Sequence, residues 1–263
     1  SWNMNSAAEY IDGELSNFAT HLMFLGADNM LSNGWNTTPA INDFFGKTKY
    51  GNNNKNILNG NKGNDILLGL GGKDYLVGKK GADLLNGGSG NDNLYGGKGN
   101  DKLIGGSGKD TAIFSFKSNV VKLFTKKKQN TKDGLDTLID IENINGGGGN
   151  DKLYGKSGSN ILNGGSGNDL LVGGKGNDKL IGGEGKDVFK LSKGKGYDLI
   201  QDFKDKQDKI FIGSMKKLKL KNKGKDVFIY SGKDLLAKVK GAKGDLSKKG
   251  KYLVWLYNLI AEE

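Results

Sequence analysis

Aspartates recur along this sequence at multiples of nine residues, and their carboxylates are its most regular chemical feature. The first series comprises Asp65, Asp74, Asp83, Asp92, Asp101 and Asp110, and the second comprises Asp151, Asp169, Asp178 and Asp187. Asn56 and Asn160 have the same phase but carry an amide. Carboxylate and amide oxygens are ligands for hard cations, provided that the fold brings them together.

These aspartates belong to a nine-residue repeat. Gly opens all twelve units, a second Gly fills the fourth place in eleven, Asp the sixth in ten and Leu the eighth in ten. The units begin at Gly51, Gly60, Gly69, Gly78, Gly87, Gly96 and Gly105, and again at Gly146, Gly155, Gly164, Gly173 and Gly182. Four places kept in phase argue against a flexible Gly and Lys linker.

Each unit predicts a tight turn followed by a short strand. Glycines at the first, fourth and often second places allow positive φ and close backbone packing. The last three residues, such as Asn93-Leu94-Tyr95, suit a strand whose central Leu points to one face. Alternating turns and strands predict a flattened coil with two units per lap, the leucines inside, and units two apart stacked on the same side.

This stacking predicts a metal site. Asp65, Asp83 and Asp101 fall on one edge of the coil, ~4.8 Å apart, and the aspartates of the intervening units fall on the other edge. Two carboxylates at this distance repel by roughly 3.5 kcal/mol at an effective dielectric of about 20. Calcium, which takes roughly six to eight oxygens from carboxylates and carbonyls, would bridge them, whereas magnesium requires a stricter octahedron. Zinc prefers His and Cys, and the chain has one His and no Cys.

The units "GGSGNDNLY", "GGKGNDKLI" and "GGSGNDLLV" resemble the calcium-binding nonapeptide of the RTX (repeats-in-toxin) proteins. The resemblance covers about residues 51–213. It implies an all-β fold, a right-handed parallel β-roll, together with export by a type I system and folding outside the cell. It also implies that the ten repeat aspartates are calcium ligands, and that Asn56 and Asn160, which bring no charge, contribute to weaker sites.

Pairs of units two apart predict roughly six strong calcium sites and two weak ones. The strong pairs are Asp65/Asp83, Asp74/Asp92, Asp83/Asp101, Asp92/Asp110, Asp151/Asp169 and Asp169/Asp187, and the mixed pairs are Asn56/Asp74 and Asn160/Asp178.

The repeats divide the chain into segments. The arrays at 51–110 and 146–190 are out of register, because the step from Asp110 to Asp151 is not a multiple of nine. Residues 111–145 alternate and are rich in β-forming residues, which predicts a β spacer, a hairpin that bridges the arrays with Lys126 to Lys128 in a solvated turn. Residues 1–50 predict a helix of about twenty residues and a linker, from apolar residues at helical spacing and a capping box.

Residues 191–263 predict a Lys-rich C-terminal β cap. The stretch "DVFKLSKGKGYDLIQDFKDKQDKIFIG" resembles the segment that closes the β-roll in serralysin-type proteases. Asp198 and Asp202 fit either a terminal cation site or surface carboxylates paired with lysines. The apolar tail "KYLVWLYNLIAEE" is too short to span a bilayer. It fits an uncleaved type I export signal, a buried last strand or helix, or both.

The charge is unusual for such repeats, which are commonly acidic. The formal net charge is +11 and every basic residue is Lys; residues 191–263 hold 18 Lys and 9 acidic residues, and residues 1–190 hold 22 and 20. Two interpretations fit: lysines that offset aspartate repulsion in the metal-free chain, or an anionic partner such as acidic polysaccharide, lipopolysaccharide or a membrane surface. Nucleic acid is not expected, because Arg is absent.

The sequence lacks the catalytic motifs of zinc proteases and of serine hydrolases, and the carboxylates that a paired-carboxylate hydrolase would need already have a structural role in the repeats. It has no H-E-x-x-H motif and no G-x-S-x-G motif, and its single His, His21, cannot supply two zinc ligands. The sequence therefore predicts a calcium-binding module that is not an enzyme, is extracellular or at the cell surface, and forms the C-terminal part of a larger secreted protein. The alternative is a self-assembling surface-layer or adhesion protein that binds an anionic glycan through its Lys-rich end.

Overall fold

The structure is a computed structural model that describes residues 46–115, 117–192, 196–204, 207–215, 217–242, 246–249 and 252–255. All regular secondary structure in these residues is β-strand. The helix predicted within residues 1–50 falls on residues that lie outside the described part of the chain.

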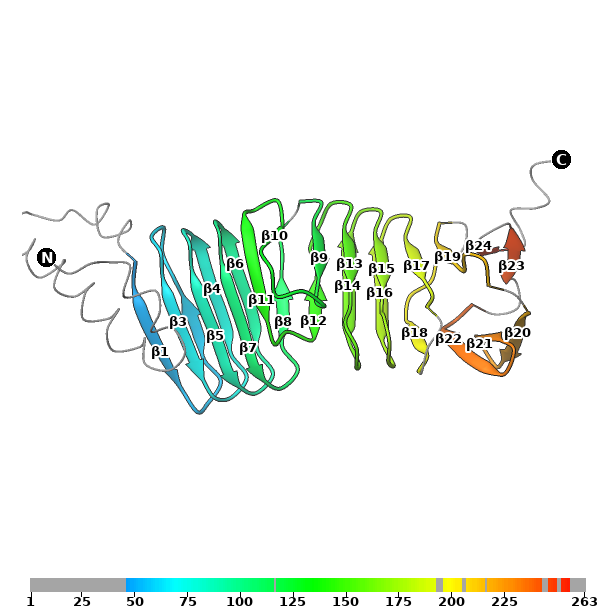
Figure 1. Ribbon diagram of the computed structural model, residues 1–263, viewed down its shortest axis with the longest axis horizontal. Coiled ribbons are helices and arrows are strands. Elements are labelled where there is room, and N and C mark those ends of the chain that lie inside the picture. Colours follow the sequence, from blue (N-terminus) through cyan, green and yellow to red (C-terminus); the bar gives the residue numbers. More distant parts are fainter. Residues whose placement is uncertain are drawn as a thin grey trace, which may run out of the picture.

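The strands form three sheets along an elongated coil (Figure 1). Sheet A contains, in spatial order, β1 (Thr48–Asn52), β3 (Ile66–Leu70), β5 (Leu84–Ser89), β7 (Lys102–Ser107), β11 (Leu135–Ile139) and β10 (Gln129–Asn130). Sheet B contains β2 (Ile57–Asn59), β4 (Tyr75–Lys80), β6 (Asn93–Lys98), β8 (Thr111–Ile113), β12 (Asn143–Asn145), β14 (Ile161–Ser166), β16 (Lys179–Glu184), β18 (Asp198–Ile200), β22 (Asp234–Val239), β21 (Asp226–Ser231) and β20 (Leu218–Lys223). Sheet C contains β9 (Val120–Lys122), β13 (Lys152–Tyr154), β15 (Leu170–Val172), β17 (Val188–Lys190), β19 (Lys209–Phe211), β24 (Tyr252–Trp255) and β23 (Leu246–Lys249).

The arrays form the predicted parallel β-roll. Within each array, paired strands run parallel and their partners lie two units apart, as in Ile66↔Leu84 and Tyr75↔Asn93. Two units therefore complete one lap, and successive units alternate between opposite sides of the roll. This register brings equivalent places of the repeat next to one another.

The core is a column of leucines. The side chains at the eighth place of the unit point inward, and Leu67, Leu76, Leu85, Leu94 and Leu103 are at most 1% exposed. Their neighbours on the same strands are only partly buried, as the alternation of a strand requires. The second array continues the column through Leu153, Leu162, Leu171, Leu180 and Phe189.

Glycines at different places of the unit have different roles. Gly97, at a second place, has φ +100°, and a Cβ there would lie 2.1 Å from Lys79 O on the neighbouring lap. Gly87, at a first place, has no positive φ, but a Cβ there would lie 2.3 Å from Asp92 Oδ2. The first glycine therefore leaves space for the aspartate of its own unit rather than providing a left-handed turn.

Only one side of the roll is interrupted by the spacer. Sheet B runs through it without a break, because β12 pairs with β8 on one side and with β14 on the other. Sheet A ends after β11, which forms an antiparallel hairpin with β10, and sheet C begins at β9. The spacer thus contains a hairpin, β10 and β11, at the end of sheet A, whereas β12 of sheet B connects the two arrays.

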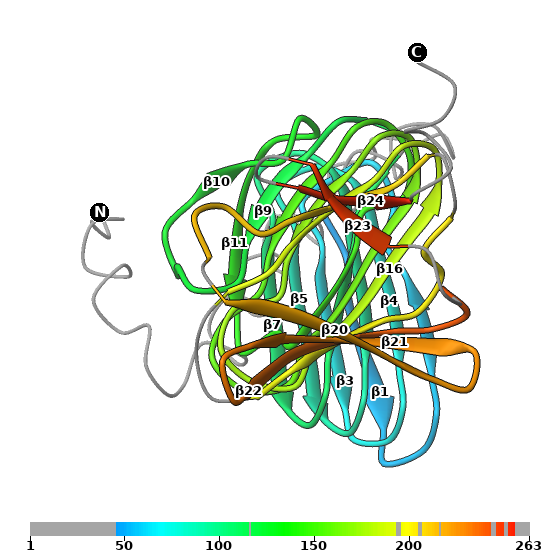
Figure 2. The ribbon, with the colours of Figure 1, turned by 90° about the vertical axis from the view of Figure 1, so that its right-hand side faces the viewer.

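The predicted C-terminal β cap closes the roll. Strand β22 pairs in parallel with β18, and β21 and β20 then follow as an antiparallel meander across the end of the roll (Figure 2). Val227, Ile229 and Val239 are at most 1% exposed and belong to the core. The first residues of the apolar tail form β24, which pairs with β19 and buries Leu253.

Candidate calcium ladders

The repeat aspartates stack into ladders along the edges of the sheets. Each of the ten is at most 2% exposed. The sheet A ladder is Asp65, Asp83, Asp101; the sheet B ladder is Asn56, Asp74, Asp92, Asp110 in the first array and Asn160, Asp178 in the second; the sheet C ladder is Asp151, Asp169, Asp187. All eight residue pairs predicted from the spacing are therefore neighbours.

One carboxylate oxygen of each ladder aspartate is held by the backbone of the preceding lap. Asp65 N donates to Asp83 Oδ1 at 2.7 Å, and Asp83 N donates to Asp101 Oδ1 at 2.9 Å. The same bond joins Asp74 N to Asp92 Oδ1 at 2.7 Å. This bond recurs at every rung, so the carboxylates are fixed in orientation as well as in position.

The other carboxylate oxygen is buried without a hydrogen-bond partner. This holds for Oδ2 of nine aspartates: Asp74, Asp83, Asp92, Asp101, Asp110, Asp151, Asp169, Asp178 and Asp187. A buried, unpaired polar atom costs about 1–3 kcal/mol, and more when it is charged, so native proteins rarely tolerate one. A repeated row of such atoms indicates that an additional positively charged partner belongs beside them.

Backbone carbonyls converge on the same places. A Cβ at Gly78 would lie 2.2 Å from Asp83 Oδ2 and 2.5 Å from Gly96 O, one lap further on. Gly164 has the same relation to Asp169 Oδ2, at 2.1 Å, and to Gly182 O, at 2.6 Å. Among the described residues no group of three or more His, Cys, Asp or Glu side chains comes together. A cation here would therefore combine carboxylates with carbonyl oxygens, a ligand set that fits calcium.

The ladders raise the pKa of their own carboxyl groups. The pKa of Asp83, Asp151 and Asp187 is raised to about 7, mainly by burial and also by neighbouring aspartates, against the lowering effect of the backbone hydrogen bonds. Burial likewise raises the pKa of Asp101 and Asp110 to about 6. Without a cation, the folded roll therefore disfavours the ionised carboxylates that it holds in place.

Besides Asp198, four ladder residues lie outside the twelve repeat units, and they were not predicted from the sequence. Asp101 N donates to Asp136 Oδ1 and Asp110 N donates to Glu142 Oε2. Asn119 N donates to Asp151 Oδ1, and Asp187 N donates to Asp208 Oδ1. Each of the four precedes a buried apolar residue by two positions: Leu138, Ile144, Val121 and Ile210. This spacing, a polar oxygen ligand followed two residues later by an inward side chain, is the signal that could have identified them.

The two asparagines use their amide oxygens for the backbone. Asn56 Oδ1 accepts from Asn52 N, and Asn160 Oδ1 accepts from Lys156 N, both at 2.8 Å. Asn160 Nδ2 also donates to Glu142 O at 2.8 Å. Both positions therefore contribute less oxygen capacity than an aspartate, besides lacking its charge.

Asp198 and Asp202 have different partners. Asp198 is 4% exposed and faces Asp178, and burial together with that neighbouring carboxylate raises the pKa of Asp198 to about 8. Both oxygens of Asp202 accept backbone hydrogen bonds, from Gly182 N at 2.9 Å and from Gly183 N at 2.8 Å. Asp198 thus extends the sheet B ladder, whereas Asp202 fastens a turn of the closing segment to β16.

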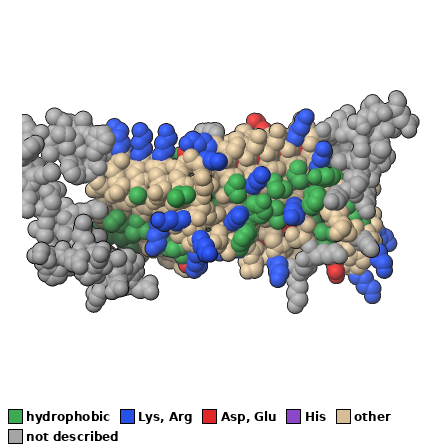
Figure 3. All heavy atoms as spheres, turned by 45° about the horizontal axis from the view of Figure 1, so that its top comes forward, with side chains coloured by type: hydrophobic (Ala, Val, Ile, Leu, Met, Phe, Trp, Pro, Cys, Tyr) green, Lys and Arg blue, Asp and Glu red, His purple; other side chains and the backbone are tan. Residues whose placement is uncertain are grey.

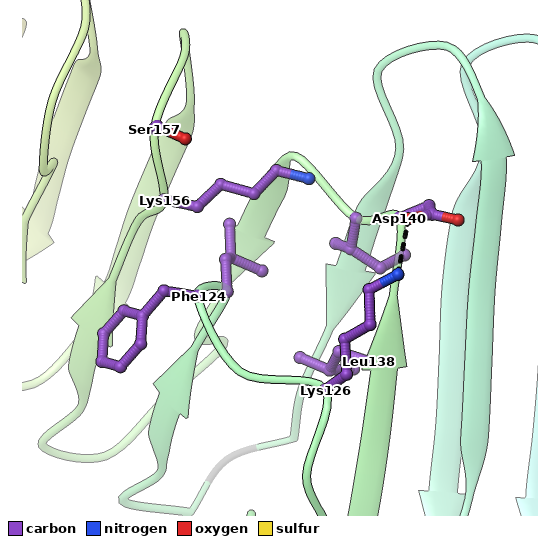
Figure 4. Close-up of a pocket in the computed structure, with 8 residues that line it drawn as sticks. Phe124, Lys126, Leu138, Asp140, Lys156 and Ser157 are labelled. Atoms are coloured by element: carbon purple, nitrogen blue, oxygen red, sulfur yellow. Dashed lines mark ion pairs between the residues drawn. The ribbon is translucent and has the colours of Figure 1, made fainter.

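A cleft lies where sheet A ends and sheet C begins (Figure 4). Its volume is about 280 Å³, and its lining includes the apolar residues Leu123, Phe124, Leu138 and Ile141. Lys126 and Asp140 lie at its rim, with Lys126 Nζ 3.5 Å from Asp140 Oδ1. This cleft marks the interruption of the roll and contains no ladder carboxylate.

The surface carries the lysines and few of the acids. Figure 3 shows lysine side chains spread over one face of the molecule with few acidic side chains between them, since the ladder aspartates are buried. Lys126, Lys127 and Lys128 are exposed, as the sequence predicted. None of the described residues belongs to a helix long and apolar enough to cross a membrane.

The comparison with family models agrees with the repeats described above. The family model for the RTX calcium-binding nonapeptide repeat matches residues 50–85, 78–112, 136–171, 154–189 and 163–197. No curated protein matches the chain. Among solved structures, the extracellular lipase LipA from Serratia marcescens aligns at 17% identity with a TM-score of 0.26, over 74% of this chain and 38% of the lipase. The chain thus spans well under half of that protein. The two arrays, with their stacked aspartates and glycine turns, belong to the RTX calcium-binding nonapeptide repeats.

Proposed function

We propose that this chain is an extracellular module whose folding is driven by calcium, and that it forms the C-terminal part of a larger protein exported by a type I system. The observation that carries the proposal is the row of buried Oδ2 atoms without hydrogen-bond partners. In this proposal the repeats bind calcium and catalyse no reaction.

The ligands in this proposal are the ten repeat aspartates, Asn56 and Asn160 as weaker contributors, and the ladder residues Asp136, Asn119, Asp208 and Asp198. Calcium would supply the positive charge that offsets repulsion between successive carboxylates. The chain's own backbone supports this role, because each rung donates an amide to the carboxylate of the next lap and, at nine of the ten repeat aspartates, the second carboxylate oxygen is left available. The site needs two adjacent laps, so binding and folding are one event.

A module that folds outside the cell needs only a low affinity for calcium. Extracellular calcium modules typically have Kd values of ~10⁻⁴ to 10⁻³ M, so the chain would remain expanded in the calcium-poor cytosol and fold after release. The absence of Cys suits a chain that folds without disulfide formation. The apolar tail after Lys251 would act in part as the export signal, while its first residues pair with β19 as β24.

A second function is favoured by the charge of the C-terminal cap. Residues 217–240 contain eight Lys and two Asp. This basic end supports adhesion to an anionic polysaccharide or lipopolysaccharide, or assembly of a coat on such a surface.

A calcium titration followed by small-angle scattering tests the first proposal. The unfolded chain should have a radius of gyration of ~57 Å, against ~18 Å for a compact globule, with an elongated roll somewhat above the smaller value. Compaction by calcium and not by magnesium at the same concentration is the expected result. A chain that stays expanded at several millimolar calcium, or that is already compact without it, contradicts the proposal. Compaction followed by growth into assemblies would favour the coat protein.

A further inference from the structure

The outermost strand of the cap carries a row of lysines. Strand β20 is the edge strand of sheet B, and Lys219, Lys221 and Lys223 alternate along it with Leu218, Leu220 and Asn222. The lysines are exposed, while Leu218 and Leu220 pack against the core. Residues two apart on a strand lie on the same face at ~6.8 Å, so the three ammonium groups follow one another in a line.

Aromatic side chains lie on the same face of the meander. The strand register places Lys219 opposite Tyr230 and Lys221 opposite Phe228, and places Phe228 opposite Lys238 on β22. Lys221 Nζ lies 5.1 Å from the centroid of the Tyr230 ring, and Lys238 Nζ lies 5.7 Å from that of Phe228. We call this surface the outer face; it consists of Lys219, Lys221, Lys223, Phe228, Tyr230 and Lys238.

The charge of the outer face is nearly all of one sign. Asp226, which the strand register places opposite Lys223, lies on the same face, and its carboxylate is paired with Lys238 Nζ at 2.8 Å. In the described part of the chain, Lys219, Lys221 and Lys223 form no ion pair with an acidic side chain. Lysines on an edge strand also prevent pairing with another sheet. Edge protection accounts for charge on β20, but it does not account for two aromatic rings among lysines on the outer face of β21.

We propose that the outer face binds a linear acidic polysaccharide, with the lysine row on the sulfate or carboxylate groups of successive sugars and the Tyr230 and Phe228 rings against sugar C–H faces. This inference rests on the second function proposed above, and it assigns the glycan-binding site of that function to the outer face. A row of charges on one strand matches a linear polymer better than it matches the plane of a bilayer. Half-buried rings beside ammonium groups provide apolar contact that a phosphate chain without sugars cannot use.

The experiment measures binding of dextran sulfate to the full chain at saturating calcium, with neutral dextran as the blank. The variant Lys219→Gln, Lys221→Gln, Lys223→Gln is compared with Lys126→Gln, Lys127→Gln, Lys128→Gln, which removes the same charge from an exposed turn of the roll. We expect the cap variant to bind at least about tenfold more weakly, the turn variant to change less than about twofold, and the wild-type affinity to fall with added salt. Equal losses in the two variants would assign binding to net charge and overturn the proposal.

A second comparison tests the sugar contact. Inorganic polyphosphate carries a similar row of charges without sugar rings, so Tyr230→Ser should weaken binding of dextran sulfate several-fold and leave polyphosphate binding within about twofold. An equal effect on both polymers, or binding to anionic phospholipid vesicles without binding to dextran sulfate, would overturn the polysaccharide assignment. Scattering on the same samples separates the two proposals, because a chain that compacts with calcium but binds no glycan contradicts only this one.

Discussion

Lys156 Nζ lies 2.9 Å from Glu142 Oε1 at the junction of the two arrays. The other oxygen of Glu142 accepts the backbone hydrogen bond from Asp110 N, so this glutamate is the rung that connects the sheet B ladder of the first array to that of the second. The junction therefore contains its own cation. At this rung a lysine ammonium lies beside the ladder carboxylate, where the regular rungs have an unpartnered aspartate oxygen.

The junction ion pair predicts a measurable contribution to stability. The Lys156 and Glu142 side chains are 28% and 20% exposed, so the pair is partly shielded from water. Lys156→Met should lower the free energy of unfolding at saturating calcium by about 1 kcal/mol. The control is Lys126→Met, whose pair with Asp140 is 3.5 Å long and mostly exposed, and which should change stability by less than about 0.3 kcal/mol. Urea unfolding measures the free energy of unfolding of both variants. Equal losses in the two variants would contradict a specific role for Lys156.

The ladder register predicts unequal effects of substitution on calcium sensitivity. Asp83 lies between Asp65 and Asp101, and so Asp83→Ala removes a carboxylate from two of the proposed strong sites. Asn160 already lacks the charge, and its amide is occupied by Lys156 N and Glu142 O. The calcium concentration at half-maximal folding should therefore rise more for Asp83→Ala than for Asn160→Ala. Circular dichroism at increasing calcium gives both midpoints. The same shift in the two variants would show that the rungs are not the calcium ligands.

The periodicity explains why so much of the roll could be predicted. A period of nine with Leu at the eighth place determines the lap, the inward residues and the stacking of Asp65 on Asp83 without any long-range information. The spacer could not be predicted in the same way, because Asp136 and Glu142 join ladders across 35 and 32 residues and no fixed interval links them to their partners. Their local pattern, an acidic residue two positions before an apolar one, is short and occurs by chance in many sequences.

The turn glycines also illustrate what spacing alone leaves open. The repeat indicates that Gly is required at the first place, but not the reason. The structure gives it: Asp92 Oδ2 fills the space that a Cβ at Gly87 would occupy. Likewise, the asparagines at the fifth place have no evident role in the sequence, yet Asn64 Oδ1 accepts from Ala82 N and Asn168 Oδ1 from Lys186 N, one lap further on. These contacts connect residues 18 apart and become visible only when the laps are stacked.

Close packing of the laps predicts that two glycines, both with positive φ, differ in how well they tolerate substitution by alanine. Gly97 has φ +100° and a Cβ there would lie 2.1 Å from Lys79 O, whereas Gly224 has φ +66° and nothing within 4 Å. Gly97→Ala should destabilise the folded chain by more than about 2 kcal/mol, because both the strained φ and the contact oppose it. Gly224→Ala should cost only about 1 kcal/mol, from the left-handed conformation alone. Thermal unfolding at saturating calcium compares them. Similar losses would mean that laps are not packed as closely as described.

The raised pKa values predict that pH affects the calcium-free and calcium-loaded chains in opposite directions. The pKa of Asp83, Asp151 and Asp187 is about 7 in the folded chain, against 3.8 for an unperturbed carboxyl group. Between these values the folded state binds more protons than the unfolded state, so without calcium its stability falls as pH rises through this window and is lowest above pH 7. Calcium requires the ionised carboxylates, so the calcium midpoint should instead fall as pH rises from 5.5 to about 8.

The measurement is circular dichroism on calcium-free protein and on calcium titrations at several pH values. The variant Asp83→Asn, Asp151→Asn, Asp187→Asn removes three of the titrating groups without a change of shape. In that variant the folding of the calcium-free chain should depend less on pH. The calcium concentration at half-maximal folding should be higher at every pH. A calcium-free wild-type chain that becomes less folded as the pH falls from about 7 to 5.5 would show that the ladder carboxylates are not closely packed in the folded state. A midpoint that rises with pH would contradict binding of calcium by ionised aspartates.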